Sequence, residues 1–114
     1  MSARVLHVAL SADYARARDS GRYRCSSLVD EGFIHCCDPD QLAGVVDRYY
    51  ADVDDLVLLV VDPAALDVEL RRENAGGGEE LFPHVYGPIL LEAVRETRPF
   101  DLGSPARIAL SGGS

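Results

Sequence analysis

Lysine and tryptophan are absent from this sequence of 114 residues, and all 11 basic residues are arginine. Without lysine, the chain cannot form a lysine Schiff base, use a lysine general base or hold a phosphate with a P-loop lysine. Asparagine, glutamine and threonine occur once each, at Asn74, Gln41 and Thr97. Neutral polar recognition therefore depends on serine, tyrosine, histidine and the backbone.

Long apolar runs are also missing. No run reaches the roughly 18 residues that a membrane-spanning helix requires, and the residues after Met1 lack the apolar region of a signal peptide. The cysteines, Cys25, Cys36 and Cys37, are odd in number, and two of them are adjacent. Neighbouring residues of a strand point to opposite faces, so we expect reduced thiols and a cytoplasmic location.

Positive charge is scarce as well. Acidic residues outnumber basic residues by 19 to 11, which gives a net charge of -8. A uniformly acidic surface repels phosphate backbones and anionic lipids, so nucleic acids and membranes are disfavoured as partners. The exception is a cluster of four arginines, Arg16, Arg18, Arg22 and Arg24. It is either the solvent-exposed face of a helix or a local anion-binding site.

The length predicts a single domain over residues 1–100, followed by a flexible tail at 101–114 that is rich in glycine, serine, proline and alanine. Apolar patterns predict about five strands, at 3–10, 33–37, 56–61, 68–73 and 89–100. Short strands with short links favour a small mixed or antiparallel sheet, and the fold class is α+β.

Two helices are expected between these strands. Gly21 ends the first, which begins at Ser11, and the sequence Asp38-Pro39-Asp40-Gln41 is a strong start signal for the second. Residues 81–88 contain two prolines and a glycine and are predicted to be irregular and rigid.

The three histidines, His7, His35 and His84, all lie in short segments of apolar and ring residues rather than in the acidic loops. Strand periodicity places His7 opposite the bulky face of its strand, and His35 opposite Ile34 and Cys36. An extended segment at 82–86 puts His84 and Tyr86 on one face. We therefore predict a common cleft for the three imidazoles, although each histidine alone is also compatible with a structural role in the core.

A zinc site is the main alternative from the residues alone. Three histidines can form an open tetrahedral zinc site, but the sequence has no His-x-x-x-His and no Cys-x-x-Cys spacing. We therefore expect no metal and keep a zinc-dependent hydrolase as an alternative. A cysteine nucleophile is disfavoured because Cys37 lies beside His35 on its strand face rather than facing it.

Two segments resemble a bacterial family known only as domain of unknown function 952. They are Tyr-Arg-Cys-Ser-Ser-Leu-Val-Asp-Glu-Gly-Phe-Ile-His-Cys-Cys at 23–37 and Phe-Pro-His-Val-Tyr-Gly-Pro at 82–88. The early strand histidine and the central Leu-Val-Leu-Leu run agree with the same family, and the match extends over roughly residues 4–98.

That family is distantly similar to the ADP-ribosyltransferase superfamily, which binds NAD in a cleft between two small sheets. This resemblance implies a fold of that type and NAD or an ADP-ribose derivative as ligand. It implies a binding set of His7, Tyr23, Ser27 and Phe33 and a catalytic set of His35, His84 and Tyr86. His7 corresponds to the histidine that holds the ribose, and the segment Phe33-Ile34-His35 to the aromatic or histidine that stacks on nicotinamide.

The sequence departs from the superfamily at His84, which falls near the position of a catalytic glutamate. An imidazole cannot supply the negative charge that stabilises a ribosyl cation, so a histidine site is better suited to holding phosphate or moving a proton. Two functions follow from the resemblance: an ADP-ribosyl- or phospho-transferase-like enzyme, or a non-catalytic nucleotide-binding module that lost the carboxylate.

Overall fold

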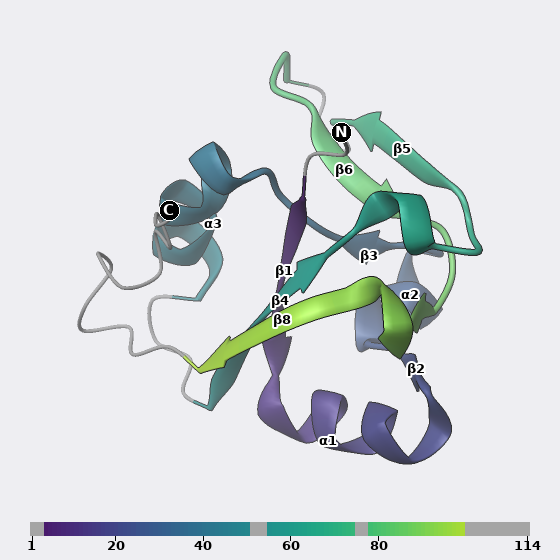
Figure 1. The fold of residues 1–114 in the computed structure, drawn as a ribbon. Coiled ribbons are helices and arrows are strands. Elements are labelled where there is room, and N and C mark those ends of the chain that lie inside the picture. Colours follow the sequence, from purple (N-terminus) through teal and green to yellow (C-terminus); the bar gives the residue numbers. More distant parts are fainter. Residues whose placement is uncertain (1–3, 51–54, 75–77, 100–114) are drawn as a thin grey trace.

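The structure, a computed structural model, describes residues 4–50, 55–74 and 78–99. Three small antiparallel sheets form its framework (Figure 1). The first, sheet A, has the order β1-β4-β8, with β1 at Val5–Leu10, β4 at Leu56–Val61 and β8 at Val94–Pro99. Sheet B pairs β2 (Arg22–Tyr23) with β7 (Ile89–Leu90), and sheet C has the order β3-β6-β5, with β3 at Ile34–His35, β6 at Phe82–Val85 and β5 at Leu70–Glu73.

Three α-helices accompany the sheets in the described part of the chain: α1 (Ser11–Ser20), α2 (Ser26–Asp30) and α3 (Leu42–Tyr49). Short 3₁₀ turns lie at Pro39–Gln41, Pro63–Ala65 and Leu91–Ala93. The predicted α+β class with a small split sheet is confirmed, and every strand pair is antiparallel. The predicted tail at 101–114 lies outside the described residues. None of the described helices is long and apolar enough to cross a membrane.

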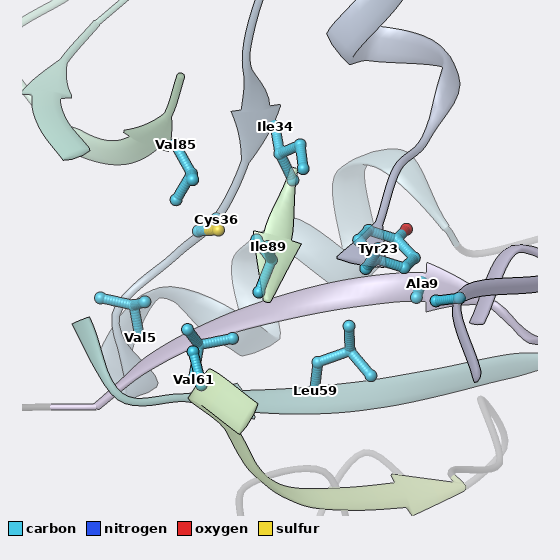
Figure 2. Packing of buried hydrophobic residues seen from close by; sticks show 11 residues of the cluster. Val5, Ala9, Tyr23, Ile34, Cys36, Leu59, Val61, Val85 and Ile89 are labelled. Carbon is cyan, nitrogen blue, oxygen red and sulfur yellow. The ribbon is translucent and has the colours of Figure 1, made fainter. Parts of the chain in front are cut away.

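Both faces of β1 are buried, including the face of His7, which the sequence pattern places opposite the bulky face. Leu6 and Val8 pack with α3 in one cluster, while Val5 and Ala9 belong to a second cluster with Ile34 of β3. Figure 2 shows side chains of sheets A, B and C meeting in this second cluster. The space beside His7 is therefore filled by protein, because sheet C covers that face of sheet A.

Helix α3 begins as the start signal predicts. Pro39 opens a 3₁₀ turn, and the Gln41 side chain accepts a hydrogen bond of 2.8 Å from the Asp38 backbone amide. This bond satisfies one of the donors that a helix start leaves free. The apolar stripe of the helix then packs Leu42 and Val46 against sheet A, and this packing places the end of α3 opposite sheet C.

Residues 81–88 are irregular only in part: Phe82–Val85 forms the central strand of sheet C, whereas Leu81 and the residues 86–88 lie outside helices and strands. Pro83 is tolerated in the strand because its carbonyl still accepts a hydrogen bond of 3.0 Å from the Cys36 amide. Pro83 has no N–H that could donate a hydrogen bond back to Cys36. Strand β3 accordingly ends at His35, one residue before Cys36.

The predicted strand at 89–100 is divided between two sheets. Ile89–Leu90 pairs with β2, the turn at Leu91–Ala93 changes the chain direction, and Val94–Pro99 pairs with β4. The periodicity of the segment is compatible with both strands, but periodicity alone does not identify the partner of a strand.

Replacing Gly87 with alanine is expected to destabilise the protein by about 1–3 kcal/mol, the usual cost of overpacking a core. A Cβ at this position would lie 2.6 Å from Cγ1 and 3.0 Å from Cβ of Val68. A rotation of the valine side chain cannot relieve a clash with its own Cβ, so the backbone must shift. Urea unfolding measures the loss, and the double variant G87A/V68A should recover part of it. Equal stability of G87A and the wild type would contradict the proposed close approach.

Candidate functional site

One face of sheet C carries a row of ionisable side chains. The strand register aligns His35 of β3 with His84 of β6, and His84 with Arg71 of β5. Directly paired residues of neighbouring strands project to the same face. The ring centroids of His35 and His84 lie 5.2 Å apart. The structure thus brings together two of the three predicted imidazoles, from segments that are far apart in the sequence.

His84 is buried and is held by a carboxylate. Its Nδ1 lies 3.0 Å from Oε1 of Glu73, and the Tyr86 hydroxyl donates a 2.5 Å hydrogen bond to the same oxygen. These bonds, first from Tyr86 and then from His84, hold the pKa of Glu73 below its usual value. Glu73 is therefore a carboxylate at neutral pH, and its bond raises the pKa of Tyr86.

The bond to Glu73 determines which nitrogen of His84 carries hydrogen. An ionised carboxylate can only accept, so Nδ1 of His84 is the donor, and in the neutral ring Nε2 is an acceptor. Nε2 makes no hydrogen bond to a described residue. Every fully buried side-chain nitrogen and oxygen of the described residues has a partner. Nε2 must therefore reach the solvent although the residue is only 2% exposed.

Aromatic rings fix the plane of this histidine. Phe33 stacks on His84 with centroids 4.2 Å apart and planes inclined by 18°, and it also contacts the rings of His35 and Tyr86. On the far side, the Arg71 guanidinium lies 4.8 Å from the centre of the Tyr86 ring. Both of these contacts restrict the rotation of the side chains that surround Glu73.

His35 is the exposed member of the pair. Its Nε2 lies 3.0 Å from Oε2 of Glu31, and both side chains are close to half exposed. A surface contact of this kind holds the ring only weakly. His35 is thus able to turn, whereas His84 is held in one orientation by Glu73 and Phe33.

A pocket of about 680 Å³ opens beside the two histidines. Its floor is apolar, with Leu6 and Val8 of β1, Val45 of α3 and Phe82 of β6. Its polar lining includes His35, His84, Glu31, Arg48, Tyr49, Tyr50 and Asn74. Burial raises the pKa of Tyr50, so this phenol stays protonated. The pocket lining therefore combines apolar side chains with a guanidinium, a carboxylate, phenols and two imidazoles.

His7, Tyr23 and Ser27 are not among the described residues that line this pocket. His7 is 5% exposed and Tyr23 is 1% exposed. Nδ1 of His7 donates a 2.5 Å hydrogen bond to the His35 carbonyl, and Nε2 accepts a 2.8 Å bond from the Tyr23 hydroxyl. Burial lowers the pKa of His7 to about 4, so it is neutral at pH 7, and burial raises the pKa of Tyr23.

Cys36 and Cys37 are poorly suited to nucleophilic chemistry. Burial raises the pKa of Cys36, and it raises that of Cys37 to about 12. A thiol with such a pKa is protonated at pH 7, whereas the thiolate is the reactive form. Cys36 and Cys37 pack in the two core clusters, and both also contribute to the lining of the pocket. Within the described part of the chain, no three His, Cys, Asp or Glu side chains are grouped so that they could hold a metal ion.

Comparison with known protein families assigns the chain to one of them. The family model described as protein of unknown function (DUF952) matches residues 8–97. The chain belongs to this family. No curated protein matches it. The family description names no activity, so the function of this DUF952 protein must be argued from the geometry of its site.

Solved structures share the fold. The crystal structure of protein CC0527 from Caulobacter crescentus matches with a TM-score of 0.77 and 27% sequence identity, over 86% of each chain. The solution NMR structure of CC0527 matches with a TM-score of 0.73 and 28% identity, over 86% of this chain and 84% of that one. CC0527 and this DUF952 chain thus share an overall fold over most of their lengths.

Sequence reasoning missed Glu73 and also the pocket residues Arg48, Tyr49 and Tyr50 at the end of α3. Glu73 ends the predicted strand at 68–73, where Glu69, Arg71 and Glu73 alternate with Val68 and Leu70. The signal for Glu73 was therefore a face of the strand made entirely of charged residues. It did not identify a partner, because only the register of β5 against β6 places Glu73 beside His84.

Proposed function

We propose that this DUF952 protein binds a nucleotide-type small molecule, NAD or an ADP-ribose derivative, in the pocket between sheet C and α3. There it acts as a transferase-like enzyme in which His84, held by Glu73, transfers a proton. The resemblance to ADP-ribosyltransferases motivates the choice of ligand. The geometry of the Glu73–His84 pair carries the proposal of catalysis.

The pocket has the size and composition that such a ligand needs. Small-molecule sites commonly enclose about 300–1,000 Å³ and combine an apolar lining with a few polar groups, and this pocket is about 680 Å³. The apolar floor and Tyr49 and Tyr50 suit the ring of a base, and Arg48 suits a phosphate. The local cation matters because the chain as a whole is acidic.

The arrangement of Glu73, His84 and the pocket is typical of a general base. The carboxylate fixes the tautomer of the imidazole through Nδ1 and leaves Nε2 to accept a proton from a bound hydroxyl or water. After the transfer, the same carboxylate stabilises the imidazolium, as in a Ser-His-Asp triad. The deprotonated oxygen forms a bond to a phosphorus atom of the bound nucleotide, the bond between that phosphorus and its leaving oxygen breaks, and His84 returns the proton to the leaving oxygen.

The structure supplies a carboxylate that the sequence analysis did not expect at this end of the site. Glu73 is not among the described residues that line the pocket, so its charge reaches a ligand through His84 rather than directly. Proton transfer to a phosphate or hydroxyl therefore fits this geometry better than direct stabilisation of a ribosyl cation.

Calorimetric titration tests the binding step. We expect NAD, ADP-ribose or AMP to bind with a Kd below about 1 mM, roughly 4 kcal/mol of binding free energy, and free ribose not to bind. The variant R48A should weaken binding, because it removes the cation that lines the pocket, whereas R98A, on the edge strand β8, should not. Absence of binding by every nucleotide at millimolar concentration would refute the proposal.

Product analysis then separates the enzyme from the non-catalytic module. Incubation with the nucleotide that binds, followed by chromatography and phosphorus NMR, should show release of phosphate or of a nucleoside phosphate. Binding without any product would leave a nucleotide-binding module and remove the catalytic part of the proposal.

A further inference from the structure

Strand β3 is an edge strand of sheet C, yet its free edge is not open to solvent. Sheet C has the order β3-β6-β5, so only one side of β3 is paired with a strand of this sheet. The amide of Cys36 donates toward β6. In an extended chain, the carbonyls of successive residues point to opposite sides. The carbonyls of Phe33, His35 and Cys37 therefore point to the free side.

Each of these three carbonyls accepts a hydrogen bond from another segment. Ser27 Oγ donates to the Phe33 carbonyl at 2.8 Å, and His7 Nδ1 donates to the His35 carbonyl at 2.5 Å. The Leu6 amide donates to the Cys37 carbonyl at 2.8 Å, and the Cys37 amide returns a bond of 2.8 Å to Leu6. Two side chains and one strand amide thus take the place of a missing neighbouring strand.

His7 is the central donor of this set, and Tyr23 fixes the tautomer in which His7 can donate. The Tyr23 hydroxyl donates to Nε2 of His7, which leaves Nδ1 as the nitrogen that carries hydrogen. Both side chains are buried, so neither can exchange its partner for water without cost. The groups that face His7 are the Tyr23 ring and the His35 backbone.

We infer that His7, Tyr23 and Ser27 are positioning residues that hold the free edge of β3 and so place Phe33 and His35 against His84. Phe33 stacks on His84 and His35 lies beside it, so a displacement of β3 separates the parts of the site. In this role His7 does not contact the ligand. The functional consequence of this positioning rests on the proposed function, because it assumes that the site binds a nucleotide. The position of β3 itself can be measured in the protein without ligand.

Three variants of His7 and its neighbours test this role. H7F keeps a ring but leaves the His35 carbonyl and the Tyr23 hydroxyl without partners. H7N retains an N–H near the position of Nδ1 and loses the contact with Tyr23. S27A removes only the donor to the Phe33 carbonyl and is the milder variant if H7F does not fold. V46A is the control, because it truncates a core residue of α3 in the other cluster.

Amide hydrogen exchange of the protein without ligand is the first readout. In H7F, exchange of the Cys36 amide, which bonds to Pro83, should accelerate at least ~10-fold relative to amides of β4, since local opening exposes one segment selectively. Nuclear Overhauser contacts between the Phe33 and His84 rings should weaken. H7N should restore both signals, S27A should show a smaller loss, and V46A should change all amides together.

Nucleotide titration is the second readout. A misplaced site costs roughly 10- to 100-fold in function, so H7F should weaken binding by about that factor and H7N should recover it. Normal β3 exchange with lost binding in H7F would overturn the inference and make His7 a ligand contact. Unchanged exchange and unchanged binding would also overturn it. If the wild type binds no nucleotide, the proposed function fails, and the exchange data still decide the role of His7.

Discussion

Replacing His84 with glutamine is expected to lower turnover of the nucleotide by about 10²–10⁴-fold, the usual contribution of general acid–base catalysis. Glutamine keeps a hydrogen-bonding side chain of similar length but cannot accept and release a proton at neutral pH. Affinity should change far less than turnover, because Arg48 and the apolar floor of the pocket remain. Steady-state kinetics with the nucleotide identified by calorimetry measures both quantities.

The residues around His84 give a graded series. E73Q removes the charge that stabilises the imidazolium, so turnover should fall, though less than in H84Q. Y86F removes one of the two hydrogen bonds to Glu73 and should have the smallest effect of the three. The matched control is E69Q, because Glu69 belongs to the same charged face but binds Arg71 at 2.8 Å rather than a histidine. Full turnover in H84Q, or an equal loss in E69Q, would contradict the assigned proton transfer.

The elements that could be predicted from sequence are those whose pattern is strong and local. The continuous apolar run of β4 has the predicted bounds, Leu56–Val61, because a strand buried on both faces needs no alternation. Helix α1 ends at Ser20, and the next residue, Gly21, adopts a φ of 82° that other residues rarely adopt. In both cases the residues that determine the structure lie inside the element or next to it.

The elements that were missed depend on partners far away in the sequence. Pro83 by itself predicts an irregular segment. Strand β6 nevertheless accommodates it, because the neighbouring strand β3 ends at His35, before the position that would pair with Pro83. The pairing of His35 with His84 follows from a register that neither segment specifies alone. Alternation placed His7 opposite the bulky face of β1, but it could not show that sheet C and Tyr23 cover that side too.

Stability should fall on acidification because of His7. Burial is the main reason why the pKa of His7 is lowered from 6.5 to about 4. The hydrogen bond of His7 to the backbone carbonyl of His35 has a smaller effect that raises the pKa. Between these two values the unfolded chain binds a proton that the folded protein does not, so the free energy of unfolding decreases as the pH falls. Integrated over this window, the loss is about 3 kcal/mol.

The contribution of His7 to the free energy of unfolding is complete above pH 6.5 and is lost as the pH approaches 4. Below pH 4, the titration of His7 no longer changes the free energy of unfolding with pH. Urea unfolding at a series of pH values between 4 and 7 measures this change for the wild type and for H7N. The carboxylates titrate in both proteins, so the difference between the two curves isolates His7. We expect H7N to be less stable at pH 7 but less sensitive to acid, and two parallel curves would show that His7 is not held neutral by the fold.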